Sequence, residues 1–201
     1  MEIFFKVLPK KGKILTQQDC HFSLYEGFYE FGNIKCWKEE LEMILANTIK
    51  VPISYGLKSA GSILYFASYF QKLIYTAHYM FLNHNSTPIQ NPDWSDLLDN
   101  RALEKNPLLI DRISFLPQAL KLEEIQNPML YLNRFFYHKT VKIWSKQWNI
   151  ILDFSLSNSN IMESIDDDLF EDIAFYPGLL EACYLIFVRD FNTKPKANEN
   201  D

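Results

Sequence analysis

The chain has 201 residues, of which 48% are hydrophobic and 22% charged, and its formal net charge is −5. This size and composition are those of a globular chain with its own core, and the length favours one domain or at most two small ones. The negative balance argues against a wide nucleic-acid surface, which needs a dense positive field. Six glycines are too few for a glycine-rich phosphate loop or a turn-dense all-β fold. We therefore expect a mainly α protein, built as an irregular multi-helix bundle.

The cysteines and the first residues bear on location. Cys20, Cys36 and Cys183 form an odd and sparse set, whereas a disulfide framework is usually even and denser. They predict reduced thiols and a cytoplasmic protein. The stretch MEIFFKVLPKKGK places its apolar residues before its positive ones and lacks a small-residue cleavage site, so we do not expect a signal peptide.

Residues 1–35 leave two structures open. Residues 1–8, MEIFFKVL, favour a strand, and residues 21–35, HFSLYEGFYEFGNIK, fit either a pair of strands or an irregular helix. A short β element is therefore one expectation for this region. From Trp37 to Pro52 the pattern predicts a helix, because core-facing residues recur at i, i+3, i+4, i+7 and i+8: Leu41, Ile44, Leu45, Thr48 and Ile49.

The next helix is predicted over residues 54–83. It is apolar nearly all round, so we expect it to be the central and most buried helix of the bundle. Residues 61–82 are long enough to span a bilayer. However, Gln71, Lys72 and His78 stand in the middle of this segment, and a central lysine is costly in lipid. The prediction is a buried helix of a soluble protein with no membrane contact.

The loop-like segments define the domain organisation. Residues 84–93 have the composition of a loop and mark the position of a subdomain hinge. We expect residues 1–191 to form a single helical domain around that hinge. Residues 192–201, NTKPKANEND, are polar and predicted to be a disordered tail.

Prolines divide the second half of the chain. A short amphipathic helix is expected after Asp93, and three prolines at intervals of roughly ten residues then allow only short helical pieces: Pro107, Pro117 and Pro128. One longer helix is predicted over residues 129–154. Two further helices are expected around Pro177 and Gly178.

The acidic stretch SIDDDLFED, residues 164–172, is the first candidate site. Three adjacent carboxylates diverge around a helix and cannot all reach one ion, so a metal site is not expected. Ser164 as a helix cap and carboxylates in the first turn explain the charge structurally. The functional interpretation is a surface for a basic protein partner, formed by Asp166, Asp167, Asp168 and Asp172.

The second candidate site lies on the predicted helix 129–154. Arg134 and His138 are four residues apart and share a helix face. A cation beside an imidazole suits phosphodiester cleavage, with His138 as base and Arg134 on the phosphate. Lys139, Lys142 and Lys146 form a stripe interleaved with aromatic residues, an arrangement that can bind nucleic acid. The structural interpretation of both sets is the polar edge of a half-buried helix.

No motif indicates a metal or a cofactor. The sequence contains no HExxH, no pair of CxxC motifs, no EF-hand loop, no Walker A or GxGxxG loop, and no GxSxG around a serine. We expect neither a metal nor a cofactor. The composition favours a non-enzymatic cytoplasmic protein-interaction module that binds a basic partner, as immunity proteins and antitoxins do. The alternative is a helical nuclease or nucleic-acid-binding protein that uses Arg134, His138 and the lysine stripe.

Overall fold

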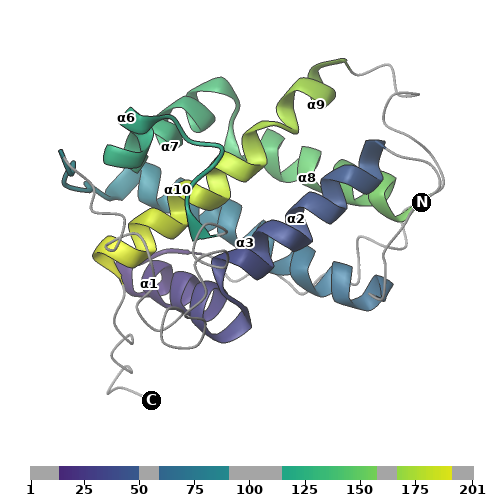
Figure 1. The fold of residues 1–201 in the computed structure, drawn as a ribbon, viewed down its shortest axis with the longest axis horizontal. Coiled ribbons are helices and arrows are strands. Elements are labelled where there is room, and N and C mark those ends of the chain that lie inside the picture. Colours follow the sequence, from purple (N-terminus) through teal and green to yellow (C-terminus); the bar gives the residue numbers. More distant parts are fainter. Residues whose placement is uncertain (1–13, 50–58, 91–114, 158–166, 192–201) are drawn as a thin grey trace.

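The computed structural model describes residues 14–49, 59–90, 115–157 and 167–191. Every regular element in these ranges is a helix (Figure 1), which confirms the expected mainly α fold. In chain order the helices are α1 (Gln17–Tyr25), the π-helical η2 (Glu26–Phe31), α2 (Ile34–Ile49), α3 (Ala60–Asn83), α6 (Leu122–Gln126), α7 (Pro128–His138), α8 (Val141–Leu156), α9 (Asp167–Asp172) and α10 (Phe175–Asp190). Within these ranges no helix combines the length and apolarity that crossing a bilayer requires.

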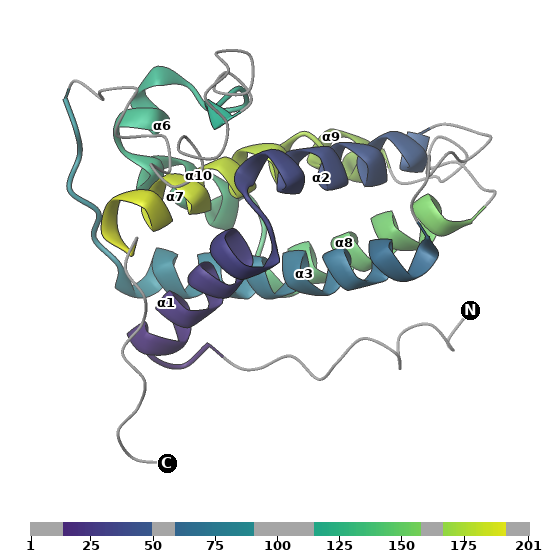
Figure 2. The ribbon, with the colours of Figure 1, turned by 60° about the horizontal axis from the view of Figure 1, so that its bottom comes forward.

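The centre of the fold is α10. It packs against α1, α2, α3, α6 and α7 (Figure 2), and all its residues from Gly178 to Val188 are buried. The sequence pattern instead predicts the most buried helix at residues 54–83. In the structure α3 buries one face and exposes residues such as Tyr65 and Leu82 on the other. The two helices differ in how their own residues are distributed. Polar residues recur along one side of α3, whereas the residues of α10 are apolar on nearly all sides of the helix.

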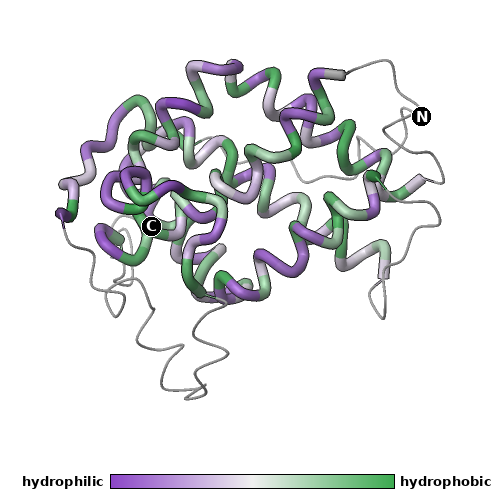
Figure 3. Tube along the Cα trace, turned by 45° about the horizontal axis from the view of Figure 1, so that its top comes forward, coloured by the Kyte–Doolittle hydropathy of each residue, from purple (hydrophilic) through white to green (hydrophobic). Residues whose placement is uncertain are grey.

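Most other helices bury one face only. Along the tube in Figure 3, hydrophilic and hydrophobic residues alternate every few positions within the helices. On α2 the buried residues include Trp37, Leu41, Ile44 and Thr48. They follow the predicted spacing, so the predicted helix is confirmed. The proline expected to end it, Pro52, lies outside the described residues.

Residues 21–31 and 34–35 are helical, with Gly32 and Asn33 between the helices, which agrees with the second of the two expectations for this region. Thr16 starts α1 with a capping box, because its hydroxyl accepts the Asp19 amide at 3.0 Å while the Asp19 carboxylate accepts the Thr16 amide at 2.9 Å. Gly27 in η2 packs on Trp37, whose indole Nε1 donates to the Gly27 carbonyl at 2.8 Å. Residues 14–35 contain no strand, and residues 1–13 lie outside the described ranges.

The helix predicted over residues 129–154 is divided into α7 and α8. The prediction of one continuous helix was wrong at Lys139 and Thr140, which both have extended backbones, with φ/ψ of −145°/152° and −70°/156°. The break lets Trp144 stack on Phe135, with ring centroids 4.0 Å apart and planes 17° apart. The Trp144 indole also donates to the Phe135 carbonyl at 2.9 Å. These two contacts stabilise the break between α7 and α8.

The loop after α3 is tied to the rest of the fold. The Ile89 amide donates to the Gln126 carbonyl at 3.0 Å, and the Gln126 side chain donates to the Gln90 carbonyl at 2.7 Å. His84 pairs with Asp190 at 2.8 Å. The hinge near residues 84–93 stays a prediction. The helix expected after Asp93, Pro107 and the tail of residues 192–201 lie outside the described ranges.

Candidate functional site

Residues from both predicted sites meet at Asp172, the last residue of α9. This carboxylate is only 1% exposed. Its Oδ1 lies 3.0 Å from His138 Nε2, at the end of α7. Its Oδ2 accepts the Lys139 ammonium and, at 2.5 Å, the side-chain amide of Gln147 on α8. The structure therefore joins the proposed acidic stretch to His138, one of the two proposed catalytic residues, through one side chain.

The surroundings of Asp172 explain why a carboxylate can be buried there. A buried charge is costly unless it is paired and hydrogen-bonded, and Lys139 supplies the opposite charge. Tyr176 lies next to this cluster and donates to the Trp144 carbonyl at 3.2 Å. Burial, and secondly the charge of Asp172, hold the pKa of Tyr176 well above its ordinary value. The phenol therefore stays a neutral donor in the core.

Arg134 and His138 lie together over the ring of Phe175. The His138 ring is parallel to it, with centroids 5.0 Å apart and planes 7° apart. The Arg134 guanidinium lies 5.7 Å from the Phe175 centroid and 4.6 Å from that of Tyr131. Both side chains are 44% exposed. The predicted common face is confirmed for these two residues.

Each of these two side chains is also held by a buried carboxylate. Asp172 holds His138, and Glu124 on α6 accepts Arg134 Nη2 at 2.8 Å. The other oxygen of Glu124 accepts the backbone amide of Lys121 at 2.9 Å. The exposed imidazole and guanidinium are thus positioned from behind by charged partners, an arrangement that favours a defined geometry for a ligand.

The acidic residues do not all face solvent. The buried residues of this segment are Leu169 and Asp172 on α9 and Ile173 directly after it, at the i, i+3, i+4 spacing. Asp168 is exposed and forms no hydrogen bond or ion pair with any described residue. Asp167 is the first residue of α9, and Asp166 and the proposed cap Ser164 lie outside the described ranges. Of the four predicted contact residues, Asp172 is thus engaged inside the protein.

The lysine stripe is interrupted by the break between α7 and α8. Lys139 lies in the break and points to Asp172, whereas Lys142 and Lys146 are exposed on α8. Trp144 and Trp148, the aromatic residues next to them in sequence, are fully buried. Because they are buried, the two indole rings cannot stack on bases. The exposed part of the stripe on α8 therefore consists of Lys142 and Lys146 without Trp144 and Trp148.

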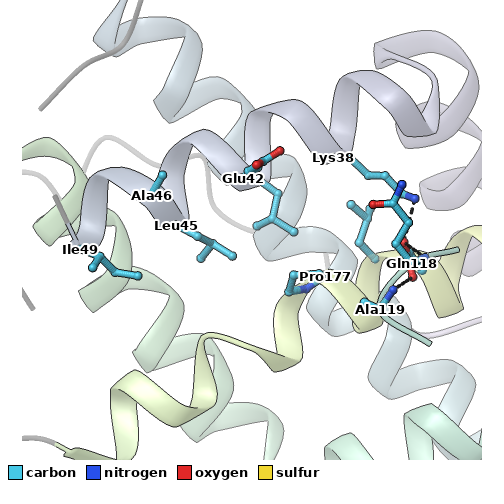
Figure 4. Close-up of a pocket in the computed structure, with 11 residues that line it drawn as sticks. Lys38, Glu42, Leu45, Ala46, Ile49, Gln118, Ala119 and Pro177 are labelled. Atoms are coloured by element: carbon cyan, nitrogen blue, oxygen red, sulfur yellow. Dashed lines mark hydrogen bonds and ion pairs between the residues drawn. The ribbon is translucent and has the colours of Figure 1, made fainter. Parts of the chain in front are cut away.

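Sequence reasoning missed a groove of about 420 Å³ between α2 and α10. Figure 4 shows Leu45 and Ile49 on one wall and Pro177 on the other, with Lys38 and Gln118 at one end. The available signal was Glu181, a lone acid in the apolar run LLEACYLIF. Its partners could not be inferred, because they come from segments at least 62 residues away in the chain.

Glu181 is a buried residue of the groove lining, paired with Lys38 at one end of the groove (Figure 4). Its two carboxylate oxygens accept the backbone amides of Gln118 and Ala119, each at 2.8 Å. Lys38 pairs with it at 2.7 Å and also donates to the Leu116 carbonyl at 2.6 Å. The charges of Lys38 and Glu181 thus compensate each other inside the fold.

Among the described residues, no three His, Cys, Asp or Glu side chains gather in a way that could hold a metal ion. Comparison of the chain with protein-family models, with curated proteins and with solved structures finds no match. The described structure is that of a mainly α protein, a class that hosts many different functions.

Proposed function

We propose that the protein is a non-enzymatic interaction module that binds a basic segment of a partner protein through α9. The observation that carries this proposal is the outer face of α9, where the exposed Glu171 lies between Phe170, which is 46% exposed, and the exposed Asp168. Exposed aromatic side chains are frequent anchors of binding energy. Carboxylates around such an anchor steer a basic partner and select against acidic ones.

The fixed position of α9 supports the same proposal. Isolated helices of six residues are marginal in water, but Asp172 and the buried Leu169 and Ile173 attach α9 to the core. A surface that is ordered before binding loses less entropy on association. Asp172 then acts as a positioning residue, while Asp168 and Glu171, together with Asp166 and Asp167, supply the charge. Neutralising a basic partner in the cytoplasm, as immunity proteins and antitoxins do, is the role we propose.

The test is affinity capture followed by reconstitution. The immobilised full chain and its double variant Asp168→Asn/Glu171→Gln are exposed to a lysate of the source cells, and a captured protein is purified and titrated. We expect a basic partner whose dissociation constant rises with ionic strength, and about a tenfold weaker complex with Phe170→Ala. The control is Glu30→Gln/Glu123→Gln, which removes the same charge from exposed sites elsewhere. Equal binding by both double variants would refute the α9 surface.

A second candidate function is supported by the contact between His138 and Asp172. A carboxylate bonded to Nε2 of a neutral imidazole leaves Nδ1 as the proton acceptor, which is how a general base is oriented. Arg134 beside it offers a guanidinium for a phosphodiester. The exposed Lys142 and Lys146 on α8 add positive charge that a nucleic-acid strand could use. Together these residues form the candidate nuclease site.

Incubation of the purified protein with total RNA and single-stranded DNA tests this second function. We expect cleavage that His138→Ala abolishes and that Arg134→Lys reduces, with Lys142→Gln/Lys146→Gln raising KM more than it lowers kcat. Cleavage that survives in His138→Ala at the wild-type rate comes from a contaminant and removes the nuclease candidate.

A further inference from the structure

The groove between α2 and α10 has an apolar interior, which favours an apolar ligand. Its interior side chains are Leu41, Leu45, Ala46, Ile49, Pro177 and Leu180. The volume of about 420 Å³ lies within the usual range of binding pockets, roughly 300–1,000 Å³. Such walls favour aliphatic groups over polar ones.

The charges around the groove select among apolar ligands. Lys38 is already paired with Glu181, so it offers no spare positive charge for an acid. Glu42 also belongs to the lining, is exposed, and has no hydrogen-bond or ion-pair partner among the described residues. The lining residues Lys38, Glu42 and Glu181 therefore carry a net charge of −1, which favours a basic ligand.

The groove continues into the surface proposed for the partner. The wall that contains Pro177 and Leu180 belongs to α10, and only Ile173 and Ala174 separate α10 from α9. Figure 1 shows α9 leading through this short turn into α10. The exposed residues Asp168 and Glu171 of α9 are thus nine and six positions before the groove residue Pro177 in the chain.

We infer that the groove receives aliphatic side chains of a partner-protein segment in which those side chains are flanked by lysine or arginine. This inference rests on the proposed function, because it specifies the partner that α9 binds. The aliphatic side chains fill the space between Leu45 and Pro177. The basic residues on either side face Glu42 and the carboxylates of α9. The groove supplies apolar specificity, and α9 supplies the aromatic anchor and most of the charge.

A display library of short random peptides, selected on the immobilised full chain, is the probe. Peptides that are enriched are synthesised with a fluorophore and titrated by fluorescence anisotropy. The expected consensus is one or more aliphatic residues flanked by basic ones. Ala46→Phe, which fills the groove, is expected to weaken binding about tenfold or more. Glu42→Gln is expected to weaken it about twofold at low ionic strength, while Glu39→Gln, exposed on α2 outside the lining, leaves it unchanged.

The variants separate the two proposals. If the melting temperature of Ala46→Phe is below that of wild type, Ala119→Leu, at the other side of the lining, is used as the groove-filling variant instead. No enrichment, a consensus without the aliphatic and basic pattern, or unchanged binding by the groove-filling variant would each overturn the inference. If Asp168→Asn/Glu171→Gln abolishes binding and the groove-filling variant does not, α9 is the site and the groove is not. The reverse result retains the groove and refutes the role of α9.

Discussion

Replacement of Asp172 by alanine is expected to destabilise the whole fold, although no partner or substrate touches this residue in our proposals. The change leaves Lys139, His138 and Gln147 without their common acceptor. Removing one member of a buried ion pair typically costs about 3–5 kcal/mol. Lys139 and His138 keep access to water, with side chains 17% and 44% exposed, so the lower end applies. We expect a loss of about 3 kcal/mol in the free energy of unfolding.

The asparagine variant gives an internal comparison. The substitution Asp172→Asn keeps one acceptor for His138 and exchanges the other oxygen for an amide donor. Gln147 Oε1 is buried without a hydrogen-bond partner in the described structure and can accept from that amide after a side-chain rotation. The expected loss for Asp172→Asn is therefore about half of that for alanine, about 1.5 kcal/mol.

Urea unfolding followed by tryptophan fluorescence measures these losses. For a chain of this size, about 3 kcal/mol also corresponds to a melting temperature lowered by about 6–12 °C. Asp168→Ala on the same helix is the control, because an exposed residue without partners usually changes stability by less than about 0.5 kcal/mol. Equal midpoints for Asp172→Ala and Asp168→Ala would refute the assignment of Asp172 as the residue that holds α9 in place.

Three further predictions concern the core. Gly178→Ala places a Cβ 2.3 Å from the ring of Tyr131, and we expect a destabilisation of about 1–3 kcal/mol in the same urea assay; a midpoint equal to wild type would contradict this packing. Only the exposed Cys36 is expected to react with a disulfide reagent in the native protein, because burial raises the pKa of Cys20 to about 12 and that of Cys183 well above its ordinary value; more than one thiol titrated without denaturant would be the opposing result. Burial lowers the pKa of His78, so the unfolded chain binds that proton more readily and stability falls as the pH drops through the ordinary value of about 6.5; His78→Gln should flatten this dependence of the urea midpoint on pH.

Local periodicity was sufficient for some elements. The helix α2 could be predicted because one face repeats apolar residues and the rest is polar, so the burial of Leu41 and Ile44 follows from spacing alone. The break between α7 and α8 could not be predicted, because neither Lys139 nor Thr140 is a helix breaker. It is stabilised by the stacking of Trp144 on Phe135, a contact that spacing within one continuous helix does not predict.

In the candidate site, too, spacing within one helix predicts which residues share a face but not which residues from other helices contact them. The common face of Arg134 and His138 follows from their spacing, but their partners Glu124 and Asp172 come from α6 and α9. The sequence interpretation placed both Asp168 and Asp172 on the partner surface, although the sequence contains a pattern that separates them. Leu169 on α9 and Ile173 directly after it form an apolar pair at i, i+4, and Asp172 lies on the same buried side.

The position of α10 has a consequence for the order in which this protein can form. A ribosome makes the chain from the N-terminus, at about 5–20 residues per second. The helices α1, α2, α3, α6 and α7 all pack against α10, yet all of them are synthesised before it. Until residue 190 has been made, the apolar faces that these helices turn toward α10 lack their partner. The part of the described structure that is deepest in the core is therefore among the last to be synthesised.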